Sequence, residues 1–204
     1  LTGYSHGFAF SGSAQGEPFG RYLNSVGQKQ FPPQVTPTLS NGGAANAGPR
    51  VGPIVISEIY YAPASGEPAF VELVNISQNT VPLYDPAIPT NTWRFNGLGF
   101  SFPQGISIPA SGIALLTAGD PETFRTRQNI PPTVQVFQYA GQLQTNGESL
   151  ELRVPGTPLT NGVPWYPEDQ VRYETAAPWP VCAAGISLQR IHLELYGNDP
   201  VNWQ

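Results

Sequence analysis

The chain has little charge, a single cysteine and no methionine. Only 11% of its 204 residues are Asp, Glu, Lys or Arg, against roughly 25% in a typical soluble domain. The formal net charge is -5, and Lys29 is the only lysine. The sequence therefore lacks the clustered basic residues that bind nucleic-acid phosphates, and we expect no nucleic-acid partner.

Other absences restrict the class of protein further. Cys182 stands alone, so it excludes an intrachain disulfide and a cysteine-based metal cluster, and we expect it to be a small buried residue. No run of about 18 apolar residues occurs, which predicts the absence of a membrane span. The lack of methionine predicts a processed chain or a piece of a longer protein. Either origin fits an extracellular or cell-surface location.

Turn-forming residues are abundant. The chain has 22 glycines and 23 prolines, which argue against long helices, while 40% hydrophobic residues suffice for a packed core. We expect strands at 54–59, 70–74, 100–102, 106–109, 112–117, 133–139, 149–154, 170–174 and 186–191. One short helix is predicted over 121–128, where Asp120 precedes a proline. Short strands separated by Pro, Gly and Asn indicate an all-β sandwich.

The chain divides into two parts. Residues 1–50 end in a low-complexity run over 40–49 and have only short candidate strands at 6–10, 19–23 and 28–31. These strands are too few for a separate sandwich, so we expect an N-terminal arm or connector with an extended β/linker character. Residues 51–204 form the predicted domain, and the arm packs on it or on another chain.

A series of motifs runs in order through the second part. They are 54–59 (IVISEI), 70–75 (FVELVN), Trp93, 100–103 (FSFP), 108–112 (IPASG), 119–121 (GDP), 147–152 (GESLEL), 177–180 (APWP), 187–191 (SLQRI) and 198–203 (NDPVNW). In this order they resemble the lamin-tail domain, which is widespread in bacterial secreted and surface proteins. The resemblance implies an immunoglobulin-like β-sandwich of the lamin-tail type over residues 51–203. Residues 1–50 are similar to the closing part of an upstream module of the same kind.

Residues that could carry catalysis are sparse. His6 and His192 are the two histidines, and a triad of His192, a serine and Asp199 has no supporting spacing or Gly-x-Ser-x-Gly elbow. Glu168 and Asp169 are neighbours, which in a regular strand point to opposite faces and so make a poor acid/base pair. We interpret them as a solvated acidic loop; the alternative is that they contribute oxygens to a surface Ca²⁺ site. We expect no enzyme activity, no catalytic residue, no cofactor and no metal site.

Three polar residues occupy strand positions among apolar residues. Asn75 begins an Asn-x-Ser pattern that is a glycan acceptor if the source organism glycosylates exported proteins. Glu58 and Glu72 are expected to accept hydrogen bonds from loop amides, or to pair with Arg190 or Arg94.

Aromatic residues supply the candidate interaction site, which comprises Tyr60, Tyr61, Tyr139, Trp165, Tyr166 and Tyr173. Aromatic side chains are enriched at interface cores where charge is depleted. We therefore expect a non-catalytic structural or interaction module of a secreted or cell-surface bacterial protein, which mediates assembly into a layer, sheath or filament. Its partners are other protein chains, including copies of itself through residues 1–50. The alternative is a carbohydrate-binding module of a larger extracellular enzyme, in which the aromatic rings stack on sugars.

Overall fold

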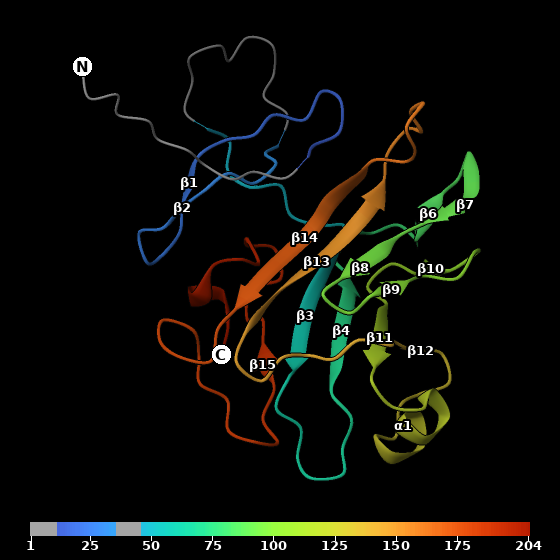
Figure 1. Ribbon diagram of the computed structural model, residues 1–204, viewed down its shortest axis with the longest axis vertical. Coiled ribbons are helices and arrows are strands. Elements are labelled where there is room, and N and C mark those ends of the chain that lie inside the picture. The colour runs from blue at the N-terminus through green and yellow to red at the C-terminus, as the bar shows by residue number, and fades with distance from the viewer. Residues whose placement is uncertain (1–11, 36–45) are drawn as a thin grey trace.

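The computed structural model describes residues 12–35 and 46–204, and this part of the chain is built mainly from strands (Figure 1). Two larger sheets, three short antiparallel ladders and one α-helix make up its regular structure. The expected all-β class is thus confirmed. The strand predicted at 6–10 and most of the run at 40–49 lie outside the described residues.

The larger sheet has five strands in the order β12–β11–β4–β3–β15, which Figure 1 shows side by side. Their bounds are β3 (Ile54–Tyr60), β4 (Phe70–Asn75), β11 (Ile113–Thr117), β12 (Gln135–Gln138) and β15 (Leu188–Gln189). Only β12 runs parallel to its neighbour. Residues of β4 alternate between buried and half-buried, as expected for a strand with one face on a core.

The smaller sheet has four antiparallel strands in the order β14–β13–β8–β9. They are β8 (Arg94–Asn96), β9 (Phe100–Ser101), β13 (Glu148–Pro155) and β14 (Trp165–Tyr173). The pairing of β13 with β14 is irregular, because Leu152 lies opposite Asp169 whereas Arg153 lies opposite Pro167. Glu168 is the extra residue of this β-bulge.

Both sheets contribute to one hydrophobic core. Ile56 and Leu73 of the larger sheet belong to the same buried cluster as Phe95 and Leu152 of the smaller sheet. The cluster also includes three tryptophans from outside the strands, namely Trp93, Trp179 and Trp203. Since each large aromatic side chain buries about 150 to 250 Å², these three residues supply much of the apolar area between the sheets.

The described N-terminal residues form a small hairpin of their own. Strands β1 (Tyr22–Leu23) and β2 (Lys29–Gln30) pair antiparallel, and an isolated bridge joins Phe19 to Pro33. A further bridge joins Gln34 to Pro49. The remaining short strands are β5 (Val81–Pro82), β6 (Tyr84–Asp85), β7 (Ile88–Thr92) and β10 (Ser107–Ile108). In Figure 1 the hairpin lies on the opposite side of the molecule from β6, β7 and β10.

The single α-helix lies where the sequence predicts it. Helix α1 (Pro121–Arg127) is capped by Asp120, whose carboxylate accepts a hydrogen bond from the Thr123 backbone N–H. Phe124 is its one buried residue and contacts Phe70 at a centroid distance of 5.4 Å. A short 3₁₀ turn (Pro200–Asn202) follows near the C-terminus. Within the described residues no helix is long and apolar enough to cross a membrane.

Candidate functional site

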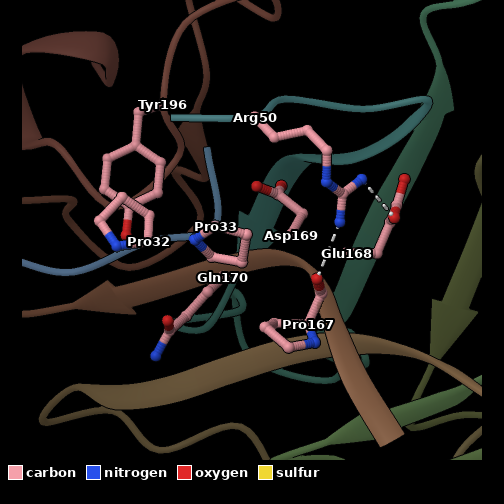
Figure 2. A pocket seen from close by; sticks show the side chains of 8 residues that line it. All are labelled: Pro32, Pro33, Arg50, Pro167, Glu168, Asp169, Gln170 and Tyr196. Carbon is pink, nitrogen blue, oxygen red and sulfur yellow. Dashed lines mark hydrogen bonds and ion pairs between the residues drawn. The ribbon is translucent and has the colours of Figure 1, made fainter. Parts of the chain in front are cut away.

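A cluster of charged side chains joins the N-terminal segment to β14. Figure 2 shows Arg50 directed toward Glu168 and the carbonyl of Pro167, with Asp169 beside it. Pro32, Pro33 and Tyr196 close the other side of the same small cavity. Its volume of about 20 Å³ leaves room for about one water molecule and for no larger ligand.

Arg50 is the cation that links the two parts of the chain. Its Nη1 donates to Glu168 Oε2 at 3.0 Å, its Nη2 donates to the Pro167 carbonyl, and its Nε lies 3.3 Å from Glu17 Oε1. Burial raises the pKa of Glu168 to about 7, and the attraction of Arg50 only partly opposes that rise. The contact between the N-terminal segment and β14 therefore includes a carboxyl group that titrates near neutral pH.

A second buried ion pair lies directly beside the first. Arg190 Nη1 is 2.7 Å from Asp169 Oδ2 and also donates to the Ile56 carbonyl. Asp169 in turn accepts a hydrogen bond from the Ile56 backbone N–H at 2.8 Å. An added Cβ at Gly197 lies 2.9 Å from both Arg190 and Asp169, so a side chain there conflicts with the pair. This pair ties the smaller sheet to β3 of the larger sheet.

Asp199 anchors the N-terminal hairpin. Its carboxylate accepts hydrogen bonds from the Tyr22 hydroxyl at 3.0 Å, from the Ser25 backbone N–H at 3.0 Å and from the Ser25 hydroxyl. The neighbouring Asn198 exchanges two hydrogen bonds with Gln30 and accepts one from the Arg172 backbone N–H of β14. Residues 198 and 199 thus connect the hairpin to the C-terminal segment and to the edge of β14.

These contacts correct the interpretation of Glu168 and Asp169. The expected solvated acidic loop is wrong, because the two residues are only 7% and 6% exposed and lie within β14. The β-bulge at Glu168 interrupts the alternation of a regular strand, so both carboxylates line the same cavity. Each of them has an arginine partner. The Arg50–Glu168 pair holds the N-terminal segment against β14, and the Arg190–Asp169 pair holds β14 near β3.

Four of the six candidate interaction aromatics are core residues. Tyr60, Tyr61, Tyr139 and Tyr173 are between 0% and 6% exposed. The rings of Tyr61 and Tyr173 are stacked at a centroid distance of 5.0 Å. The hydroxyls of the other two donate to partners on the same chain, Tyr60 to Glu67 and Tyr139 to the Ala69 carbonyl. These four residues offer no ring to a partner.

Trp165 and Tyr166 are half-buried neighbours at the start of β14. The guanidinium of Arg94 lies 3.8 Å from the centre of the Trp165 ring, so a cation already covers one face of this ring. Tyr166 instead lines a surface groove with a volume of about 600 Å³. Trp165 is therefore covered on one face by a cation, whereas Tyr166 lines an open groove.

The groove, which we call the aromatic groove, lies between the end of the β13–β14 hairpin and the chain around β5 and β6. Its described lining residues are Ala14, Gln15, Val81, Pro82, Tyr84, Asp85, Pro86, Trp93, Val154, Pro155, Gly156, Thr157, Leu159 and Tyr166. Three of them are aromatic, several are apolar, and Asp85 is the one charged side chain. Such a mixture is typical of ligand-binding pockets, whose volumes range from about 300 to 1,000 Å³.

The remaining polar candidates have structural partners. Asn75 is fully buried, and its side-chain amide donates to the carbonyls of Asn79, Ile108 and Pro109. A glycan cannot be attached to this amide in the folded protein. Glu58 accepts from the Ser187 hydroxyl.

Two more candidates differ from expectation in their partners or burial. Glu72 accepts from the Ser57 hydroxyl, so neither it nor Glu58 pairs with an arginine. Cys182 is half-buried, and its backbone N–H donates to the Tyr61 hydroxyl. His192 is exposed and lies 3.7 Å from Glu194, whereas His6 lies outside the described residues.

Comparison with models of known protein families, with curated proteins and with solved structures gives no significant match. The lamin-tail resemblance accordingly stays a prediction from the motifs.

Sequence reasoning missed the residues that hold the N-terminal segment in place. Arg50 is the only charged residue between Lys29 and Glu58. A lone arginine after an uncharged run was a usable signal, because a charged side chain close to a folded domain commonly has a carboxylate partner. No comparable signal marks Tyr22 or Ser25, whose partner Asp199 is more than 170 residues away.

Proposed function

We propose that this chain is a non-catalytic structural module of a secreted or cell-surface bacterial protein, and that it associates with further copies of itself. We also propose that its fold is an immunoglobulin-like sandwich of the lamin-tail type. Two sheets that share one core support this fold. The closing motif at 198–203 supports it as well, since Trp203 belongs to the shared core and its indole donates to the Gly197 carbonyl.

One observation carries the assembly proposal: exposed aliphatic side chains gather on two segments that bind each other. We call them the seam surface, defined by Leu23, Val26, Val181, Ile186, Ile191, Leu195 and Val201. Two of these residues lie in the N-terminal hairpin and five lie at 181–201, so they are seven of the ten exposed large hydrophobic residues of the described chain. Asp199 and Asn198 hold the two segments together.

A surface of this kind favours a protein partner. Single exposed aliphatic residues are ordinary, whereas a contiguous patch of them is typical of an interaction site. We propose that the exposed residues of these two segments form such a patch. The low charge of the chain favours a second copy, because charged residues are depleted at interface cores and little repulsion opposes contact between identical surfaces. The docked hairpin supplies part of this surface, and the proposal therefore needs the hairpin in place.

Paired surface variants test the proposal by light scattering after size-exclusion chromatography. Val181→Ser with Ile186→Ser removes two residues that are 72% and 57% exposed, and we expect it to lower the apparent mass at high protein concentration. The matched control is Ile88→Ser with Leu159→Ser, which removes exposed aliphatic residues outside the seam surface. Equal loss of association in both variants contradicts the proposal, and so does an apparent mass that neither variant changes.

A further inference from the structure

The aromatic groove combines apolar ring surfaces with polar groups that have no hydrogen-bond partner among the described residues. Trp93 is only 7% exposed, yet none of the described residues accepts a hydrogen bond from its indole N–H. The hydroxyls of Tyr84 and Tyr166 likewise have no hydrogen-bond partner among the described residues. None of the three is among the fully buried unpaired atoms of the described chain, so each reaches solvent and is open to a ligand.

The charge of the groove limits the ligand. Its described lining has no Arg, Lys or His, and its one carboxylate is Asp85. Oδ1 of Asp85 accepts from the Ala87 backbone N–H at 2.8 Å, and none of the described residues donates to Oδ2. Gln15 and Thr157 add an amide and a hydroxyl that both donate and accept. A complementary ligand has no anionic group, offers donors as well as acceptors, and has apolar faces.

We propose that the aromatic groove binds a neutral oligosaccharide. A sugar ring has C–H faces that pack on aromatic rings and hydroxyl groups that donate and accept hydrogen bonds around its edge. A proline-rich peptide also packs on aromatic grooves, but its prolines have no N–H donor, so it leaves Asp85 without a partner. The oligosaccharide therefore matches more of the groove's polar groups.

Tyr166 has a defined position in this site. An added Cβ at Gly156 lies 2.3 Å from one edge of the Tyr166 ring, so this ring lies where only glycine leaves room. The opposite edge of the ring lies near Gly12. Trp165, by contrast, is outside the groove lining and has Arg94 over one face. We therefore assign sugar contact to Tyr166, Tyr84 and Trp93, and none to Trp165.

Isothermal titration calorimetry with cellohexaose, laminarihexaose, xylohexaose and mannohexaose tests the proposal. We expect at least one of the four to bind with a Kd of about 1 mM or tighter. Tyr166→Ala and Tyr84→Ala are expected to weaken that binding by about tenfold or more, as for aromatic anchors at other sites. Gly156→Ala leaves every groove side chain present but displaces the Tyr166 ring, so it is expected to weaken binding as well.

Trp165→Ala is the matched control and is expected to change the affinity by less than about twofold. Thermal unfolding of each variant separates a loss of binding from a loss of folding. The proposal is overturned if none of the four sugars binds at about 10 mM, or if Trp165→Ala weakens binding as much as Tyr166→Ala. It is also overturned if decaproline binds in a Tyr166-dependent manner while the sugars do not.

Discussion

Arg50 Nη1 lies 3.0 Å from Glu168 Oε2, and this contact joins a residue at the end of the N-terminal segment to a bulged residue in β14. The side chain of Glu168 is only 4% exposed, whereas that of Arg50 is 23% exposed. The ion pair is thus largely shielded from water on the side of the carboxylate. Its stability depends on pH, whereas the N-terminal hairpin is held separately by Asn198 and Asp199.

Glu168→Gln is expected to flatten the dependence of stability on pH. Burial raises the pKa of Glu168 from 4.5 to about 7, so the folded protein holds this proton more tightly than the unfolded chain. The resulting stability is fully present below pH 4.5 and is lost as the pH rises toward about 7, at most roughly 3 kcal/mol. Urea unfolding between pH 5 and 8 measures this slope.

Arg50→Gln provides the matched comparison, because it removes the nearby cation and leaves the carboxyl buried. It is expected to raise the pKa of Glu168 further and to extend the slope to higher pH. Asp169, the other carboxyl in the cavity, also has a raised pKa because of burial, so some slope remains in Glu168→Gln. An unchanged slope in Glu168→Gln contradicts the assignment.

Asp199→Ala is expected to release the N-terminal hairpin. It leaves the Tyr22 hydroxyl and the Ser25 N–H and hydroxyl without an acceptor, at a cost of about 2 to 4 kcal/mol in the free energy of unfolding. Hydrogen exchange at Ser25 is expected to become faster. Asp120→Ala serves as the control, since it removes an exposed helix cap, which destabilises the protein only locally, and leaves exchange at Ser25 unchanged.

Arg190→Met is expected to destabilise the protein strongly. The arginine side chain is fully buried, and its loss leaves Asp169 as an unpaired buried charge, which typically costs about 3 to 5 kcal/mol. Arg153→Met breaks the more exposed ion pair with Glu151 and is expected to cost less than about 1 kcal/mol. Chemical denaturation of the two variants compares these costs, and similar values for both contradict the structural role of Arg190.

Asn75→Ala is expected to destabilise the protein by about 2 to 4 kcal/mol, because the carbonyls of Asn79, Ile108 and Pro109 lose their donor. Expression in a glycosylating host followed by mass spectrometry checks the same contacts. We expect the folded protein to have no glycan at Asn75. A folded product that has a glycan at Asn75 contradicts these contacts, because a glycan-bearing amide nitrogen cannot donate to all three carbonyls.

Local patterns predicted much of the fold. The apolar runs and turn residues located β3, β4, β11 and β13, and the Asp120–Pro121 pair located helix α1. The strand expected at 170–174 begins earlier, at Trp165, because Pro167 and the bulge at Glu168 conceal its pattern. The same bulge explains why Glu168 and Asp169 do not point to opposite faces of the strand, as neighbouring residues of a regular strand do.

Less of the candidate site than of the fold could be predicted from the sequence. Burial of Tyr60, Tyr61, Tyr139 and Tyr173 follows from contacts between distant segments, and an aromatic residue at a strand end looks the same whether it faces the core or the solvent. The aromatic groove likewise combines residues from 14 to 166. Only the folded chain shows that Tyr166 lines it and that Arg94 covers Trp165.

Sedimentation velocity of the intact chain over a wide concentration range tests the proposed assembly most directly. The monomer has a mass of 21.9 kDa. Contact between seam surfaces predicts that the weight-average sedimentation coefficient rises with concentration and that Asp199→Ala, which releases the hairpin, reduces this rise. A coefficient that stays at the monomer value up to about 1 mM protein contradicts the account.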